Sequence, residues 1–348
     1  MTKKLQADLV QKASNANAHK TIVLQATDNA IAQAEIASTG KPSKVRPKVI
    51  AIVGPTASGK TSLAIHLAKT RNCEIISADS RLVYKGFDIA SAKPTPEERE
   101  GIEHYLIDVV EPEVEYSVAN FCEDAKIAIN KIISKGKTPI IVGGTGLYFR
   151  ILLEDFAPPK VAPNYELRAE LEELETEKLH EMLNELDPVS ASKIHFNNKV
   201  KIIRALEVCK TLDRPHSQAA GKKEPEFEVE WIGLNPTDRA VLYERVNRRV
   251  DMMVEAGLVE ETKALLEKHG RISNFVSTIG YQEILEYLDG KVTLHEALEN
   301  LKQNTRRYAK RQLTWFRKDK NITWVNIKAI DTATTIARKI IGRLGISS

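Results

Sequence analysis

The stretch Gly54-Pro55-Thr56-Ala57-Ser58-Gly59-Lys60-Thr61 has the residue types and spacing of a phosphate-binding loop. A glycine-bearing turn directs backbone N–H groups at an anion, and Lys60 adds a positive charge beside them. The hydroxyl of Thr61 is of the kind that holds Mg²⁺ next to bound phosphates. The pattern predicts a ligand with two or more linked phosphates, provided that a strand precedes the loop and a helix follows it.

The elements around the loop fit that condition. The apolar run Val49–Val53 precedes it, and residues from Ser62 to Ala68 have helical spacing. Further strands are expected at 74–77, 105–109, 138–142, 230–234 and 322–325, and further helices at 117–136, from about 238, and up to about 344. This alternation predicts an α/β fold with a doubly wound, mostly parallel sheet.

Polar groups follow three of these strands. They are the phosphate loop, Asp79-Ser80 and Thr145. Because ligands of such sheets bind at the carboxyl ends of the strands, we expect the three to meet in one crevice. Asp79 could hold Mg²⁺, act as a general base on an incoming nucleophile, or merely cap the next helix.

The composition suggests three segments. Residues 1–46 are rich in Ala, Lys, Asn, Gln, Ser and Thr, and we expect a disordered extension there. Residues 47–158 and 229–348 should form the α/β core. Residues 159–228 read as an inserted all-helical domain with an acidic first helix, 165–186, and a basic second half. That polarity fits a nucleic-acid face or two solvated helices equally well.

The net charge, the cysteines and the length of the apolar runs narrow the class of protein. The net charge of +4 is no argument for nucleic-acid binding, because residues 1–48 hold eight Lys/Arg and three Asp/Glu, so the remainder sums to −1. A local cluster is more informative: residues 302–320 carry eight Lys/Arg and one acid, interleaved with aromatic residues. Three cysteines without a CxxC pair indicate a reducing compartment and no zinc module. No apolar run reaches membrane-spanning length, so we expect a cytoplasmic protein, with a monomer as the default.

A series of motifs then occurs in one order along residues 48–326. They are Gly54–Thr61, Asp79–Ile89, Ala92–Pro94, His104–Asp108, Gly143–Tyr148, Arg204–Glu207, Ile279–Tyr281 and Lys310–Trp315. In these motifs the chain resembles the tRNA dimethylallyltransferase (IPP transferase) family, in its bacterial form without a following Cys/His finger. The resemblance implies a loop that holds the diphosphate of dimethylallyl diphosphate rather than ATP, and transfer of the prenyl group to N6 of adenosine 37 in tRNA.

The resemblance also implies residue roles. Asp79 would accept the amine proton and orient the adenine, and Thr145 would help to position the substrate. Lys60, Thr61 and Mg²⁺ would offset charge on the departing diphosphate, joined by Lys93, Arg245 and Arg249. Contacts with the anticodon stem-loop of tRNA would come from Asp79, Ser80, Arg81, Leu82, Arg168, Val200, Lys201, Arg204, Ser277, Gly280, Gln282, Lys310, Arg311, Gln312, Trp315 and Arg317.

Two residues depart from the family pattern. Ala90 stands where a glycine is usual, and Gly146 replaces a bulkier residue and could loosen the turn that holds Thr145. Three other functions stay open from the residues alone: prenylation of free adenine nucleotides, a P-loop kinase of small metabolites, and an RNA-binding module without chemistry. The insertion and the basic C-terminal helix argue against the first, because a free nucleotide needs neither.

Overall fold

The chain divides into two units. A computed structural model describes residues 46–328 and 330–344, so the expected extension lies outside the described residues except for Arg46. Residues 46–149 and 227–344 form one unit, called the core unit below, and residues 150–226 form the other, called the inserted unit. No helix in the described part of the chain is long and apolar enough to cross a membrane.

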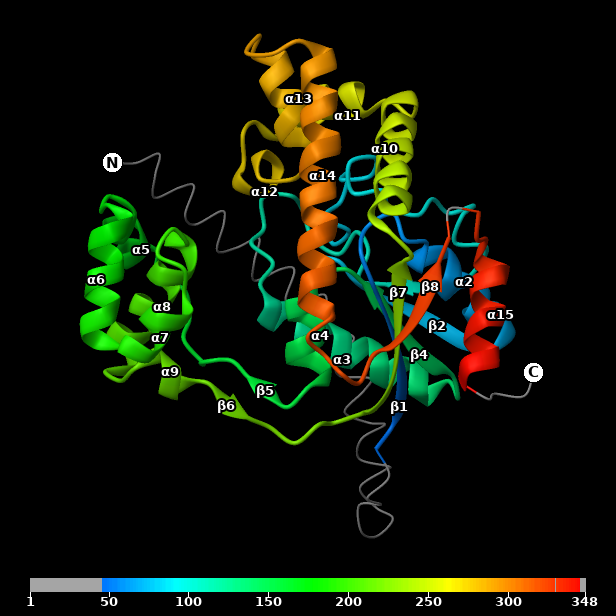
Figure 1. The fold of residues 1–348 in the computed structure, drawn as a ribbon, viewed down its shortest axis with the longest axis horizontal. Helices are drawn as coiled ribbons and strands as arrows, with labels where there is room; N and C mark the ends of the chain where they lie inside the picture. The colour runs from blue at the N-terminus through cyan, green and yellow to red at the C-terminus, as the bar shows by residue number, and fades with distance from the viewer. Residues whose placement is uncertain (1–45, 329, 345–348) are drawn as a thin grey trace. The chain divides into compact units, whose positions relative to one another are not determined.

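The core unit is built on a six-stranded sheet in which all neighbouring strands are parallel (Figure 1). The order is β3-β2-β4-β1-β7-β8. The strands are β1 (Lys48–Val53), β2 (Cys73–Ala78), β3 (His104–Tyr105), β4 (Thr138–Gly143), β7 (Glu228–Pro236) and β8 (Thr323–Ile327). The central strands are buried along nearly their whole length, as expected for a sheet covered on both faces. The predicted doubly wound α/β fold is confirmed.

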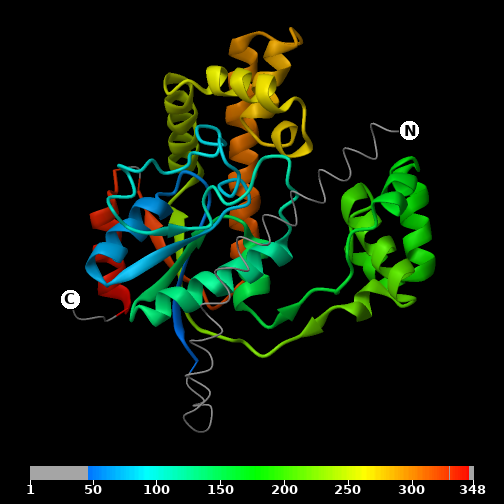
Figure 2. The same cartoon turned by 180° about the vertical axis from the view of Figure 1, so that it is seen from behind.

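Helices cover both faces of the sheet. On one face α2 (Lys60–Thr70) and α15 (Ala333–Leu344) pack against each other and the strands, with Leu63, Ile75 and Ile336 in their shared core. On the other face lie α3 (Val118–Ser134) and α4 (Gly146–Leu153) (Figure 2). There the ring of Phe121 stacks on that of Tyr148. Each helix buries one apolar stripe and leaves its charged residues to solvent.

Five helices form a group at the carboxyl ends of the strands, and the last of them runs back beside the sheet toward the start of β8 (Figure 1). They are α10 (Arg239–Glu255), α11 (Leu258–His269), α12 (Ser273–Val276), α13 (Tyr281–Leu288) and α14 (Leu294–Phe316). The aromatic rings of Phe87, Phe275 and Tyr281 form the centre of this group, with ring centroids 5.0–6.3 Å apart. A capping box of Thr293 and Glu296 starts α14, the long basic helix.

The inserted unit is mainly helical. Its helices are α5 (Tyr165–Glu172), α6 (Thr176–Leu186), α7 (Pro188–Lys193), α8 (Lys199–Leu212) and α9 (His216–Ala219). Leu179, Leu183, Ile202 and Leu206 make its core. An antiparallel pair, β5 (Phe156–Ala157) and β6 (Gly221–Lys222), joins the two ends of the helical segment.

Local structure differs from expectation at three places. The expected strand 105–109 is only two residues long, because Leu106 and Asp108 adopt positive φ angles of 62° and 56° that a strand cannot contain. The single helix expected at 165–186 is divided at Glu175, which is extended and starts α6. The segment 159–228 is not purely helical, since β6 falls within it.

Candidate active site

The phosphate loop folds as a tight turn between β1 and α2. Gly54 has a φ of 148°, and a Cβ there would lie 2.9 Å from the carbonyl oxygen of Leu234, so only glycine fits. Ala57 and Gly59 also have positive φ angles, of 60° and 90°, which turn successive N–H groups to one side. Gly59 then caps α2, and Lys60 is the first helical residue.

Two cations meet at this loop. The ammonium of Lys60 donates to the carbonyl oxygen of Pro55 at 2.6 Å. Burial and the charge of Arg249 lower the pKa of Lys60 to about 7, against an opposing effect of Asp79. Burial likewise lowers the pKa of Arg249, which donates to the carbonyl oxygen of Ser91 at 3.2 Å. Two desolvated cations so close together indicate a site for an anion, because an anion would stabilise both charges.

One cavity of about 470 Å³ opens beside the loop. It lies at the carboxyl edge of the sheet, as expected for this class of fold. The predicted site residues that line it are Thr56, Lys60, Thr61, Asp79, Ser80, Arg81, Leu82, Arg249, Ser277, Gln282, Arg311 and Gln312. The structure thus brings together the phosphate loop, the end of β2 and the basic face of α14.

Asp79 and Thr145 are linked through the backbone between them. The Oδ1 atom of Asp79 accepts from the N–H of Arg81 at 2.8 Å, and Oδ2 has no hydrogen-bond partner among the residues that the structure describes. The hydroxyl of Thr145 accepts from the N–H of Ser80 at 3.2 Å, so it holds the end of β2 rather than lining the cavity. A carboxylate with one oxygen anchored and the other free can accept a proton from a ligand in the cavity.

Gln312 joins the phosphate loop to the turn after β4. Its Oε1 accepts from the N–H of Thr56 at 2.8 Å, and its Nε2 donates to the carbonyl oxygen of Gly144 at 3.1 Å. A Cβ on Gly144 would lie 2.0 Å from this amide nitrogen, so glycine is needed for the contact. Both ends of the Gln312 amide are therefore used within the protein.

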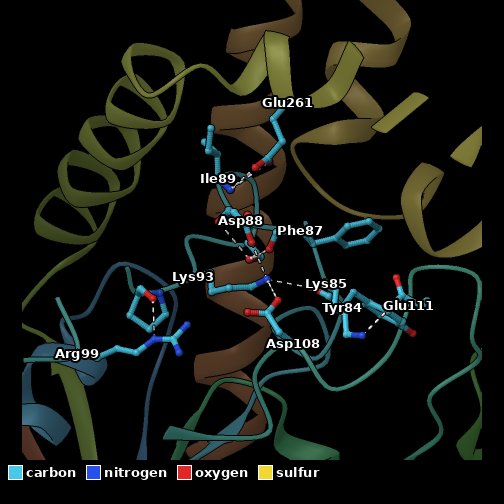
Figure 3. Close-up of polar contacts among 12 residues, drawn as sticks. Tyr84, Lys85, Phe87, Asp88, Ile89, Lys93, Arg99, Asp108, Glu111 and Glu261 are labelled. Carbon is cyan, nitrogen blue, oxygen red and sulfur yellow. Dashed lines mark hydrogen bonds and ion pairs between the residues drawn. The ribbon is translucent and has the colours of Figure 1, made fainter. Parts of the chain in front are cut away.

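Residues 79–94, which follow β2, include part of the cavity lining and are held by polar contacts from two sides (Figure 3). Lys93, predicted to reach the diphosphate, has a side chain that is only 5% exposed. Its ammonium donates to the carbonyl oxygen of Tyr84 at 3.0 Å and pairs with Asp88 at 2.6 Å and with Asp108. The three donors of the ammonium thus have three acceptors, and Lys93 does not line the cavity.

From the other side, Glu261 of α11 binds the same segment (Figure 3). Its carboxylate accepts from the N–H groups of Ile89 and Ala90 at 2.8 and 3.2 Å, and from the hydroxyl of Tyr281 at 2.7 Å. Glu261 could not be identified from the sequence, because an acidic residue in an ordinary amphipathic helix carries no signal of such a contact.

Other predicted diphosphate and tRNA residues of the core unit lie outside the main cavity. Arg245 donates to the carbonyl oxygen of Lys328 at 3.4 Å, and Arg317 donates to Asn235 at 2.9 Å. Gly280, with a φ of 106°, starts α13 against Ala90, whose Cβ would lie 2.8 Å from a Cβ at position 280. Ala90 therefore packs against a glycine.

A second groove lies along α14. It is lined by Arg307, Lys310, Arg311, Thr314, Trp315 and Lys318. Trp315 is 38% exposed, and a Cβ on Gly146 would lie 2.2 Å from its indole. Gly146 therefore allows Trp315 to lie against the first turn of α4. Cations beside an exposed aromatic ring are a combination suited to a nucleic-acid backbone and its bases.

In the inserted unit, two predicted tRNA residues share one carboxylate. Glu207 is fully buried and accepts from Arg168 at 2.9 Å and from Arg204. Val200, at the start of α8, is 75% exposed, and Lys201 is exposed beside it. The arginines are thus held by a structural ion pair, whereas Val200 and Lys201 are free to contact a ligand.

Comparison with known proteins gives one consistent family. The family model described as IPP transferase matches residues 82–319. The tRNA dimethylallyltransferase of Acetivibrio thermocellus is 48% identical over 300 residues, which is 84% of this chain and 96% of that protein. The protein of the same name from Bacillus mycoides is 45% identical, over 87% of this chain and 97% of its own.

Solved structures that are similar to this chain carry related names. A tRNA isopentenylpyrophosphate transferase from Bacillus halodurans is 43% identical, with a TM-score of 0.64 over 86% of this chain and 97% of that one. A eukaryotic dimethylallyltransferase, described as acting on tRNA, is 30% identical, with a TM-score of 0.72 over 85% of this chain and 78% of its own.

Proposed function

We propose that this chain, which belongs to the IPP transferase family, transfers a dimethylallyl group from dimethylallyl diphosphate to N6 of adenosine 37 in tRNA and releases diphosphate. One observation carries the proposal: Lys60, Arg249 and the free oxygen of Asp79 lie at a single cavity. An anion site beside a carboxylate is what transfer of a diphosphate-activated group to an amine requires.

The reaction follows from these positions. The N6 lone pair of the adenine attacks C1 of the prenyl group, and the bond between C1 and the diphosphate oxygen breaks, with its electron pair leaving on the diphosphate. Lys60, Arg249 and the N–H groups of the loop stabilise that negative charge. The proton lost from N6 passes to the carboxylate of Asp79. The adenine must leave its base stack to reach the cavity.

Mg²⁺ fits the site as an ion carried by the diphosphate. Thr61 lies in the first turn of α2 and lines the cavity, so its hydroxyl could complete such an ion's coordination. Within residues 46–328 and 330–344 no cluster of three His, Cys, Asp or Glu could hold a metal by itself. Mg²⁺ commonly keeps waters and phosphate oxygens as most of its ligands. When bound, it would neutralise charge on the leaving group.

We further propose that tRNA contacts the groove on α14 through Lys310, Arg311 and Trp315. The cations would bind phosphates, and the indole would stack on an unpaired base. Val200 and Lys201 provide a second exposed patch, on the inserted unit.

A transfer assay tests the function. Purified protein is mixed with labelled dimethylallyl diphosphate, Mg²⁺ and an anticodon stem-loop that has adenosines at positions 36–38, with AMP as the rival acceptor. We expect label on the stem-loop and none on AMP. Asp79→Asn should abolish transfer while leaving the Kd for dimethylallyl diphosphate within a few fold. Label on AMP alone would refute the tRNA proposal, and ATP-dependent phosphorylation of a small acceptor would refute prenyl transfer.

A further inference from the structure

One face of α14 forms a wall of the main cavity. The residues of α14 that line it include Leu301, Thr305, Tyr308 and Gln312, which follow one another at intervals of four, three and four. Side chains at this spacing project from one side of a helix. Tyr308 has the only phenol among the described residues that line the cavity, and no step of the proposed reaction uses it.

The phenol of Tyr308 lies beside the phosphate loop. Gln312, one turn further along α14, accepts from the N–H of Thr56 in the loop at 2.8 Å and donates to the carbonyl oxygen of Gly144. The amide nitrogen of Gln312 has a second hydrogen, and Gln312 also acts as a hydrogen-bond donor toward the phenol. The phenolic oxygen is therefore next to a side chain that itself contacts the loop.

Tyr308 is also close to the charges on both sides of the bond that would break. Burial, followed by the charge of Asp79, raises the pKa of the phenol. Tyr308 in turn interacts electrostatically with Arg249 and opposes the lowering of the Arg249 pKa by burial. Asp79 would take the proton from N6, and Arg249 would hold the diphosphate. The oxygen that joins C1 to the diphosphate must occupy the space between these two groups, within the same cavity.

The phenol is suited to donate a hydrogen bond in this space. Its oxygen accepts in the contact with Gln312, so its own hydrogen is left for a ligand. The raised pKa keeps that hydrogen on the oxygen. The guanidinium of Arg311 lies 5.8 Å from the centroid of the Tyr308 ring and helps to position it. A hydrogen bond from such a donor strengthens as its acceptor becomes negatively charged.

We propose that Tyr308 is a further catalytic residue, whose hydroxyl donates a hydrogen bond to the oxygen that leaves C1 of the prenyl group. This inference rests on the proposed prenyl transfer. As the N6–C1 bond forms, the C1–O bond breaks and its electron pair stays on that oxygen. Tyr308 keeps its hydrogen, and the N6 proton passes to Asp79.

The state of this oxygen decides when the contact matters. In the intact donor it is an ester oxygen, which is a weak acceptor. In the transition state and in the released diphosphate it carries negative charge, so the hydrogen bond is stronger there. The hydroxyl should therefore affect the rate of transfer and the binding of the product more than the binding of the donor.

Tyr308→Phe tests this, because it removes the hydroxyl and keeps the ring. Single-turnover transfer from labelled dimethylallyl diphosphate to the anticodon stem-loop should slow about a hundredfold, the effect of losing one donor to a developing anion. Calorimetry with Mg²⁺ should give a Kd for dimethylallyl diphosphate within about twofold of the wild type, and a Kd for inorganic diphosphate that is about tenfold higher.

Tyr243→Phe is the matched control. Tyr243 lies on α10, is 37% exposed and is not among the residues that line the cavity, although it too has an arginine, Arg306, beside its ring. The rate and both Kd values of Tyr243→Phe should equal those of the wild type.

A wild-type rate in Tyr308→Phe would overturn the catalytic role of the hydroxyl while prenyl transfer stands. An equal rise in both Kd values would also overturn it, because the variant would then have only loosened Gln312 and the loop. If the wild-type protein transfers no prenyl group, the proposed function fails, and the Kd values still decide the contact. A loss of affinity confined to inorganic diphosphate supports a hydrogen bond to that oxygen, and unchanged Kd values refute it.

Discussion

Binding of the prenyl diphosphate should weaken as the pH rises above 7, because Lys60 loses its proton in the free enzyme. Its pKa of about 7 reflects burial and the charge of Arg249, with no anion bound. A bound diphosphate places negative charge beside the ammonium and raises that pKa again. The protonated form is therefore the one that binds, and binding above pH 7 must take up a proton.

The size of the effect follows from the free-enzyme pKa. When only the protonated form binds, Kd scales with one plus the ratio of neutral to charged Lys60. With a pKa of about 7, Kd rises about eightfold between about pH 7.5 and pH 8.5, or roughly 1.2 kcal/mol. The diphosphate adds little to the pH dependence in this window, because its last phosphate pKa is about 6.

Calorimetry between pH 7 and 9 measures both quantities. Titrations of dimethylallyl diphosphate with Mg²⁺ in two buffers of different ionisation enthalpy give Kd and the number of protons taken up. Lys60→Arg is the matched control, because arginine stays charged throughout this range. Its Kd should be independent of pH. A wild-type Kd that stays constant from pH 7 to 9, or an equal slope in Lys60→Arg, would refute this account of the site.

Three further changes test other contacts. Glu261→Gln removes one carboxylate acceptor from the backbone at Ile89, so urea unfolding should show a free energy of unfolding that is lower by about 1–3 kcal/mol. The Kd for the diphosphate should also rise severalfold, because the same segment holds Arg249 through the carbonyl oxygen of Ser91. Unchanged values would contradict the role of Glu261. Glu74 is buried and pairs with the partly exposed Lys135 and Lys137. Burial opposes ionisation of Glu74, but the hydrogen bonds from these lysines and from Tyr105 lower its pKa to about 2, so Glu74→Gln should cost up to about 3 kcal/mol at pH 7, and the difference should vanish as the pH falls from about 5 to 2. Gly146→Ala should displace the indole of Trp315 and change tryptophan fluorescence, with weaker stem-loop binding and an unchanged Kd for the diphosphate.

The phosphate loop and most of the central strands could be predicted from local sequence patterns. The phosphate loop has fixed spacing, and buried parallel strands read as continuous apolar runs, so β1, β2 and β4 were placed within a residue or two. The meeting of the loop with Asp79 followed from the rule that strand ends share one edge.

Contacts between distant segments were beyond reach of such patterns. The position of Lys93 depends on its contacts with Asp88 and Asp108. The chain brings these residues together through positive φ angles, for example at Ala92 and Leu106, and neither residue type predicts such an angle. The pairing of β2 with β3 places His104 beside Ile75, and β3 is too short for its sequence to show alternation.

The β5–β6 pair has a consequence for how such a chain could have been assembled. Ala157 pairs with Gly221, so the ends of the intervening helical segment are adjacent, about 5 Å apart as in any antiparallel pair. A segment that enters and leaves at one point can be acquired, exchanged or lost without shifting the register of the parallel sheet. The helical segment is in this sense a replaceable module, and an ancestral enzyme could have closed the same position with a two-residue turn.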